Sequence, residues 1–263
     1  MQGKKDNETV YDSNDFVELA LFTSIGDRQE QQDNFGYMLN KKEALIVVCD
    51  GMGGHEKGKQ ASNNAVRVIL DTYTDIKKNI DTDPVGMLNE LTMSANREVC
   101  AINADGISGT TLVLVYINGR ELFWNSVGDS RAYILRGSKY SQFTQDQNFK
   151  TVLEEKLSRG LISNEEFEQD IVNGESLINY LGMDPLELID YNVKPLNLES
   201  NDRIVLMTDG LYKYLDEDNI FQLLKNFRNI NDAVNALENR VKNTSRQLKQ
   251  SRDNMTVALI KAL

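Results

Sequence analysis

The chain has 263 residues, of which 40% are hydrophobic and 26% charged, a composition ordinary for a globular protein of one large domain or two small ones. Its formal net charge of −11 disfavours nucleic acid and anionic lipid surfaces as partners, because most of its field repels them. The longest apolar runs, 44–49 and 112–117, are far shorter than the roughly 20 residues that a membrane-spanning helix needs, so we expect no membrane segment.

The N-terminus and the cysteines predict a cytoplasmic protein. Residues 1–15 are polar and mixed in charge, so we expect a frayed tail and no secretion signal. The two cysteines, Cys49 and Cys100, fit a reducing compartment better than a disulfide framework. Because Cys49 precedes Asp50 on a predicted strand, its side chain should point to the opposite face and pack in the core.

The first part of the chain predicts three strands followed by two helices. Apolar and β-branched runs predict strands at 16–25, 34–39 and 43–49, the last two joined as a hairpin. An amphipathic helix is predicted at 59–80, and a second begins near Asp83-Pro84, where aspartate can cap and proline fits the first turn. The expected apolar faces are Ala61, Ala65, Val68, Ile69, Tyr73 and Ile76 in the first helix and Leu88, Leu91, Ala95, Val99 and Ile102 in the second.

A compact β block follows. Asn118-Gly119 lies between two alternating segments and is a strong hairpin signal, because both central positions of such a turn favour positive φ. Residues 112–115 are apolar on both faces, which predicts a layer on each side of that strand. The strands of the block are predicted at 110–117, 120–127, 131–135 and 140–143.

The last part of the chain leaves the β pattern and then returns to it. Residues 145–183 are charged and helical in character, and we interpret them as an excursion beside the site. No repeat or linker is evident, so we predict one domain over residues 16–263, built from paired sheets and flanking helices. The predicted elements here are helices at 149–159, 164–172, 216–227 and 231–248 and strands at 201–207 and 255–263.

Asp50 joins an apolar strand to a glycine-dense turn. An unpaired carboxylate at a buried strand end would cost roughly several kcal/mol in desolvation, so it needs a partner. A cation is the simplest partner. Gly51, Gly53 and Gly54 could take positive φ and bring a main-chain carbonyl close to the same ion.

Four more acidic residues occupy similar junctions between strand and turn, and together they predict carboxylates converging on one edge of a β-structure. Taken singly, the Asp209 and Asp253 positions would be explained by turn chemistry. Mg²⁺ and Mn²⁺ prefer oxygen ligands, and a chain with a single histidine cannot form a His-rich zinc centre. The four residues are Asp33, Asp129, Asp209 and Asp253.

Six ordered motifs resemble those of the metal-dependent type 2C serine/threonine protein phosphatases, in the form found in the bacterial branch. The resemblance covers residues 23–262 and implies an α+β fold, a four-layer α-β-β-α sandwich of two mainly antiparallel sheets flanked by helix pairs. The motifs are Asp27-Arg28-Gln29-Glu30-Gln31-Gln32-Asp33, Asp50-Gly51-Met52-Gly53-Gly54-His55 with Ala61-Ser62, Ser108-Gly109-Thr110-Thr111, Gly128-Asp129-Ser130-Arg131, Thr208-Asp209-Gly210-Leu211 and Arg252-Asp253-Asn254-Met255-Thr256-Val257.

The resemblance implies ligands for two ions, Mn²⁺ or Mg²⁺. Asp50 would bridge both ions, the Gly51 carbonyl would serve one, and Asp209 and Asp253 would complete the other. Asp33 would hold water bound to the metal. A pair of ions about 4 Å apart can activate water for direct hydrolysis of phosphoserine or phosphothreonine proteins, without a phosphoenzyme.

Other roles follow from the resemblance or stay open. Arg28 would bind the substrate phosphate, because its planar fork offers two donors. Asp129 would hold a third, weaker metal with Asp209, or would belong to a tight turn with a local pair to Arg131. His55 would act as a general acid or orient the glycine turn. A further candidate, with no role assigned, is Asn254.

The chain also departs from the family pattern. Gln32 stands where eukaryotic relatives carry a glutamate, and Gln31 replaces an asparagine of the bacterial pattern. Met52 stands where eukaryotic relatives have histidine, so a general acid does not transfer. Residues 173–182 lack the His-Pro and Arg that many bacterial relatives carry there, so the family's substrate preference does not transfer. We expect a monomer that opposes a cytoplasmic kinase.

Two other functions compete with this one. Residues 53–60 nearly match the phosphate-loop pattern, but Gln60 cannot supply the hydroxyl that binds Mg²⁺, and no series of parallel strands follows. The second alternative is a catalytically inactive phosphoprotein-binding module of the same fold, which should have lost a ligand. In this chain Asp50, Asp209 and Asp253 all remain.

Overall fold

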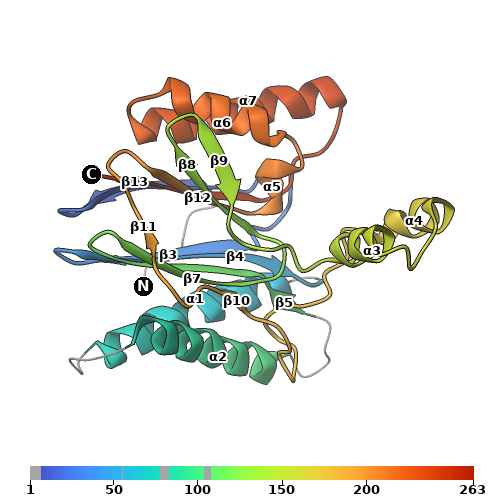
Figure 1. The fold of residues 1–263 in the computed structure, drawn as a ribbon, viewed down its shortest axis with the longest axis horizontal. Coiled ribbons are helices and arrows are strands. Elements are labelled where there is room, and N and C mark those ends of the chain that lie inside the picture. The colour runs from blue at the N-terminus through green and yellow to red at the C-terminus, as the bar shows by residue number, and fades with distance from the viewer. Residues whose placement is uncertain (1–6, 55, 78–82, 104–107) are drawn as a thin grey trace.

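The computed structural model describes residues 7–54, 56–77, 83–103 and 108–263, arranged as two packed sheets with helices outside them (Figure 1). The elements, in chain order, are β1 (Asn7–Ser13), β2 (Val17–Ser24), β3 (Asp33–Leu39), β4 (Glu43–Met52), α1 (Lys57–Ile76), α2 (Pro84–Ile102), β5 (Gly109–Thr110), β6 (Leu112–Asn118), β7 (Glu121–Val127), β8 (Arg131–Arg136), β9 (Lys139–Gln142), α3 (Phe149–Ser158), α4 (Asn164–Asp170), η1 (Ile171–Asn173), β10 (Asp190–Tyr191), β11 (Leu196–Asn197), β12 (Arg203–Met207), α5 (Asp209–Tyr212), α6 (Glu217–Asn226), α7 (Ile230–Leu248) and β13 (Met255–Ala262).

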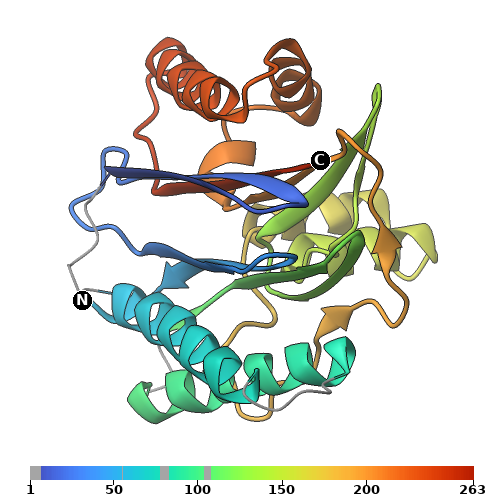
Figure 2. The ribbon, with the colours of Figure 1, turned by 90° about the vertical axis from the view of Figure 1, so that its left-hand side faces the viewer.

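Every strand pairing among these elements is antiparallel. The first sheet has the order β1-β2-β13-β12-β8-β9, so strands from both ends of the chain lie side by side in it. The second sheet has the order β10-β7-β6-β4-β3, with β11 on β7 and β5 on β4. Figure 2 shows the two sheets stacked, with α6 and α7 outside the first and α1 and α2 outside the second.

Three apolar cores hold these layers together, and this confirms the predicted four-layer sandwich. One core lies between the sheets, one between the second sheet and α1 and α2, and one between the first sheet and α5 to α7. The strand β6 contributes to two of them. Leu112 and Leu114 face the helices, whereas Val113 and Val115 face the other sheet, as alternation along a strand requires. Cys49 is buried on the helix side, as predicted.

The helices follow the sequence pattern with two corrections. Asp83 caps α2 by accepting hydrogen bonds from the Val85 and Gly86 amides, as expected. In α1, however, Val66 lies on the buried face in place of Val68. Ile102 was expected on the apolar face of α2, but it is 40% exposed because it lies at the end of the helix.

The predicted tail over residues 1–15 is wrong for its second half. Asn7–Ser13 form β1, which pairs in register with β2 from Asn7–Ser24 to Ser13–Glu18. The strand is polar and mostly exposed because it lies at the edge of the first sheet, so its sequence resembles a tail. The short helix α5, which begins at Asp209, was not predicted either.

Residues 145–183 carry α3 and α4, which project from one end of the sandwich (Figure 1). The base of this segment is anchored. The side-chain Oε1 of Gln147 accepts a hydrogen bond from the Gly128 backbone amide, and the backbone amide of Gln147 donates to the Gly128 carbonyl. At the other end Leu181 exchanges two backbone hydrogen bonds with Thr110. None of the described helices combines the length and the apolar character needed to cross a bilayer.

Candidate active site

Asp33 and Asp50 are brought together by strand register. They are direct partners where β3 pairs with β4. Two residues further along, Phe35 and Val48 belong to the core between the sheets, so by alternation the two carboxylates face the same inter-sheet space. Asp33 is buried and Asp50 is half-buried.

Hydroxyl-bearing residues fix the backbone of Asp50. Its amide donates to Thr111 Oγ1 at 2.9 Å, and its carbonyl accepts from the Thr111 amide and from Thr110 Oγ1, both at 2.9 Å. Thr111 Oγ1 is also 2.7 Å from Ser130 Oγ. The Ser-Gly-Thr-Thr and Gly-Asp-Ser motifs therefore hold the strand end that carries Asp50.

Asn254 ties the N-terminal loop to the turn that carries Asp253. Its Oδ1 accepts the Gln32 amide at 2.8 Å, and its Nδ2 donates to the Ile25 and Glu30 carbonyls, each at 2.9 Å. The Gln32 carbonyl in turn accepts the Gly51 amide at 3.2 Å. One buried side chain thus links the loop before β3 and the turn before β13 to the end of β4.

Gly210 places Asp209 against the same turn. A Cβ at this position would overlap the Asn254 carbonyl oxygen, so only glycine allows α5 to approach the turn so closely. Asp209 is the first residue of α5 and therefore lies beside the Asp253 turn. Asp209 follows β12 and Asp253 precedes β13, and these two strands are neighbours in the first sheet.

Thr208 connects the two sheets at this edge. Its Oγ1 donates to Asp33 Oδ2 at 2.8 Å and accepts the Thr256 amide at 2.9 Å. The other carboxylate oxygen, Asp33 Oδ1, is buried without a hydrogen-bond partner. A buried acceptor left in this state is costly, and it fits a site that receives a further ligand such as bound water.

The electrostatics place all five predicted carboxylates near one another. Burial, with the charges of Asp33 and Asp209 next in importance, raises the pKa of Asp50 well above its ordinary value, and Asp129 and Asp253 add to the effect. Burial and Asp209 likewise raise the pKa of Asp33 to about 7 and that of Asp129 to about 6. Carboxylates that raise one another's pKa in this way are typical of a site that binds cations.

Two of these carboxylates now pair with side-chain cations. Asp253 Oδ2 accepts from Arg28 Nη2 at 2.6 Å, and Asp209 Oδ2 accepts from Lys213 Nζ at 2.5 Å. Within residues 7–54, 56–77, 83–103 and 108–263, no three carboxylate, thiol or imidazole groups are arranged to hold a metal ion as they stand. Coordination by this set therefore requires Asp253 to leave Arg28, whereas the Lys213 pair occupies only the Oδ2 atom of Asp209.

Comparison with known proteins decides the family. The family model described as Protein phosphatase 2C matches residues 23–250, most of the chain. This chain belongs to the protein phosphatase 2C family. The serine/threonine phosphatase stp of Listeria innocua is 28% identical over 240 residues, which cover 89% of this chain and 90% of that protein.

Solved structures agree with the fold of this phosphatase. The serine/threonine phosphatase of S. agalactiae is 26% identical, with a TM-score of 0.78, and the match covers 94% of this chain and all of that one. The catalytic domain of the serine/threonine protein phosphatase PstP, solved in complex with 2 manganese ions, is 22% identical with a TM-score of 0.69, covering 94% and 99% of the two chains. At that identity the second likeness concerns the fold alone.

Two further predicted site residues of the phosphatase, Gly51 and Asn254, are located by their backbone contacts. The Gly51 carbonyl oxygen lies beside Gly58 at the start of α1, and a Cβ at Gly51 would overlap the Gly58 carbonyl oxygen. Gly51 is thus required for close approach, whereas positive φ occurs in this turn at Gly53. Asn254 uses both polar atoms in the backbone bonds described above, which gives it a positioning role. His55 lies outside the described residues.

The turn around Asp129 agrees with one part of the turn expectation and departs from the other. The Gly128 φ of 95° confirms a tight turn, but Arg131 does not pair with Asp129. Its Nη2 donates instead to Asp146 Oδ2 at 2.7 Å, and its guanidinium lies 3.8 Å from the Tyr212 ring centroid. Asp129 itself is buried, with Asp209 as its strongest charged neighbour.

Sequence reasoning missed Thr208 and Lys213 as parts of the phosphatase site. Thr208 precedes Asp209 in a recognised motif, so its position near the site could have been noted, but not its bond to a residue of the other sheet. Lys213 follows Asp209 by four residues, the spacing that lets helical side chains pair. That signal was available once α5 was known to be a helix.

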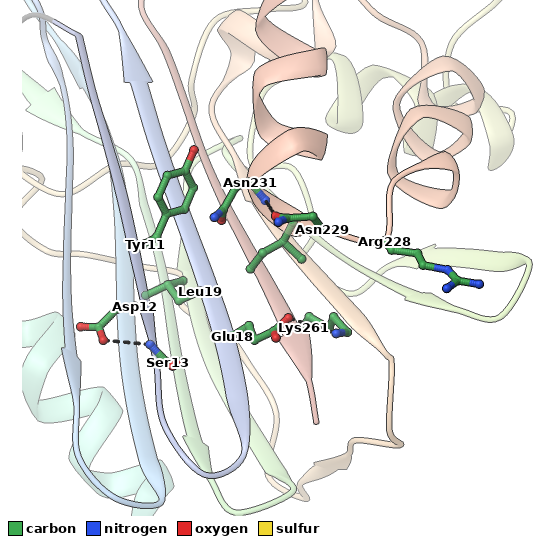
Figure 3. Close-up of a pocket in the computed structure, with 10 residues that line it drawn as sticks. Tyr11, Asp12, Ser13, Glu18, Leu19, Arg228, Asn229, Asn231 and Lys261 are labelled. Atoms are coloured by element: carbon green, nitrogen blue, oxygen red, sulfur yellow. Dashed lines mark hydrogen bonds and ion pairs between the residues drawn. The ribbon is translucent and has the colours of Figure 1, made fainter.

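A separate hollow lies at the opposite end of the first sheet (Figure 3). Lys261, which lines it, is eight residues beyond Asp253, roughly 25 Å along an extended strand. Lys261 Nζ pairs with Glu18 Oε2 at 3.0 Å, and acidic and basic side chains are mixed around the hollow. The hollow therefore contributes nothing to the carboxylate site.

Proposed function

We propose that this phosphatase hydrolyses phosphoserine and phosphothreonine in proteins by direct attack of water, assisted by two divalent cations, Mn²⁺ or Mg²⁺. The observation that carries the proposal is the position of Asp50, which is half-buried between the sheets and whose charge interacts with those of four other carboxylates. An arginine, Arg28, lies beside this group with its side chain 58% exposed. Carboxylates that can bind cations thus lie next to a solvent-exposed guanidinium group that can bind phosphate.

The residues fit a pair of hard cations. All the candidate ligands are oxygen donors, the buried Asp33 Oδ1 has no hydrogen-bond partner, and burial with like charge disfavours the ionised Asp50 in the metal-free protein. Asp50, the Gly51 carbonyl, Asp209 and Asp253 would hold the ions. When bound, the ions would supply positive charge that lowers the pKa of a water molecule and neutralises the phosphoryl oxygens.

The protein's own side chains would position the substrate and the water. Arg28 would leave Asp253 and donate hydrogen bonds to two phosphate oxygens through its planar guanidinium group. Because the chain has a net charge of −11, this local contact would bind the anionic substrate in place of attraction by the protein as a whole. Asp33, fixed through Oδ2 by Thr208, would direct its second oxygen at water. No side chain forms a covalent phosphoenzyme in this scheme.

The partner proposed here is a phosphorylated protein produced by a serine/threonine kinase in the cytoplasm. The relatives described above are named serine/threonine phosphatases, and this supports the substrate class. We also propose that the phosphatase acts as a monomer.

A phosphothreonine peptide assay tests the proposal. Phosphate release should require added Mn²⁺ or Mg²⁺, should stop on chelation and should recover when the metal is restored. Absence of turnover at every metal concentration, combined with binding of the phosphopeptide, would favour the inactive binding module. Tight ATP binding without metal-dependent turnover would favour the phosphate-loop alternative, which the antiparallel pairing of β4 already opposes.

A further inference from the structure

Lys213 follows α5 directly and directs its ammonium group at the carboxylate site. Its Nζ lies 2.5 Å from Asp209 Oδ2 and 3.6 Å from Glu175 Oε2. Its side chain is 38% exposed and that of Asp209 is 17% exposed, so the pair lies partly inside the protein. Asp209 begins α5 just after β12 of the first sheet, whereas Glu175 belongs to the projecting 145–183 segment.

Asp129 also lies close enough to Lys213 for the two charges to interact. The hydroxyl of Tyr212, the residue before Lys213, donates to the Asp129 carbonyl oxygen at 3.1 Å and fixes the Asp129 turn against α5. The Lys213 charge opposes the rise in the Asp129 pKa, and Asp129 and Glu175 in turn help to raise the pKa of Lys213 against the effect of burial. Two carboxylates therefore pair with Lys213, and the charge of a third, Asp129, acts on it.

We propose that the Lys213 ammonium takes the place of a third divalent cation between Asp209 and Asp129. This inference rests on the proposed function, because it concerns how many ions the same carboxylates can hold. A third ion would need oxygens of Asp209 and Asp129, and a cationic side chain already contacts Asp209 on that side. The residues therefore do not fit a third metal, although both aspartates are present.

The lysine also has a structural consequence that a weakly held ion would lack. Because Lys213 is covalently attached, it neutralises Asp209 at any metal concentration, and through Glu175 it connects the projecting segment to the site. A compact, hydrated ammonium group with three donors suits contact with several carboxylates at once. The phosphatase thus carries a fixed positive charge where an exchangeable one would otherwise be needed.

The test counts Mn²⁺ ions bound by equilibrium dialysis with elemental analysis on wild type, Lys213→Met and Lys213→Arg. Lys242→Met is the matched control, because Lys242 pairs with Glu238 at the same spacing and with similar side-chain exposure, 35% and 20%, on α7. Thermal unfolding checks that each variant is folded, and Lys213→Gln replaces Lys213→Met if the latter is not.

We expect wild type, Lys213→Arg and Lys242→Met to bind the same number of ions and Lys213→Met to bind one more. The additional ion should be lost again in Lys213→Met combined with Asp129→Asn. Equal counts for Lys213→Met and wild type would overturn the inference, as would loss of one ion when Asp129→Asn is introduced into wild type. A wild-type protein that binds no Mn²⁺ would contradict the proposed function itself and this inference with it.

Discussion

Asp33 and Asp50 lie directly opposite each other on β3 and β4, at the edge where the two sheets meet. Side chains at such positions have Cβ atoms about 4.5–5.5 Å apart, and like charges there destabilise a sheet. Burial adds to this cost and raises the pKa of both carboxyl groups, that of Asp33 to about 7. An arrangement that is unfavourable in the free protein is expected where a cation offsets the repulsion.

This pair predicts that the metal-free protein loses stability as pH rises. The pKa of an unfolded aspartate is about 3.9, and the folded values are raised for Asp33, Asp50 and Asp129. The stabilising effect is therefore complete below about pH 4 and disappears as pH rises through about 6 to 7. The opposite effect of Asp27, whose pKa Arg252 holds below its ordinary value, acts only in more acidic solution.

Thermal unfolding in a chelator measures this dependence. The melting temperature should be higher at pH 5.5 than at pH 8, and Mn²⁺ should recover most of the difference at pH 8 because ions bind the folded state. Asp33→Asn should flatten the profile. A chelated protein that becomes more stable between pH 5.5 and 8 would show that the raised pKa values are not present in solution.

Arg28 is predicted to bind the substrate phosphate once Asp253 accepts a metal. Arg28→Ala should lower kcat/KM for a phosphothreonine peptide by roughly 10- to 100-fold, the loss expected from hydrogen bonds to a charged group. Arg28→Lys should recover part of it, because lysine lacks the planar fork. Arg97→Ala is the control, since Arg97 is an arginine of similar exposure that also pairs with a carboxylate, Glu90, but on α2. Equal effects at Arg28 and Arg97 would remove Arg28 from the site.

Asp209→Asn should abolish most of the activity while the protein stays folded. The change keeps the size of the side chain but removes a charge proposed to hold a cation, and we expect turnover to fall by about 100-fold or more. Asp218→Asn is the matched control, because Asp218 also lies in the first turn of a helix, α6, where it accepts a hydrogen bond from Tyr140. Unchanged turnover in Asp209→Asn would show that the proposed ligand set is wrong.

Asn254 is predicted to position the site without touching the substrate. Asn254→Ala removes three partly buried hydrogen bonds to backbone groups, at a cost of up to about 1–3 kcal/mol for each group left unsatisfied. Denaturant unfolding should therefore detect a loss of stability together with lower turnover. Full stability in Asn254→Ala would refute the positioning role.

Most strands and helices of this fold were predictable because one face of each is buried. The strand β6 is apolar on both faces and lies between two layers, and Asp83 caps α2 as its residue type suggests. The edge strand β1 was not predictable, because a strand with few buried side chains has the composition of a tail. The choice between Val66 and Val68 depends on how α1 packs against its neighbours, which a helical period alone does not fix.

The candidate site divides in the same way. An aspartate at the end of an apolar strand is a local feature, so Asp50 and Asp209 could be identified as candidates from the chain alone. The bond from Thr208 to Asp33 joins residues 175 positions apart in different sheets, and no local pattern encodes it. The ion pair between Glu175 and Lys213 likewise depends on where the projecting segment lies.

The central claim is that Asp50, Asp209 and Asp253 gather around divalent cations at this edge. A crystal structure of the protein grown with Mn²⁺ tests it most directly, because manganese can be located by its anomalous scattering. We predict anomalous peaks within coordination distance of all three carboxylates, with Asp253 released from Arg28. Anomalous peaks located elsewhere, or none next to Asp50 at a saturating Mn²⁺ concentration, would contradict the account.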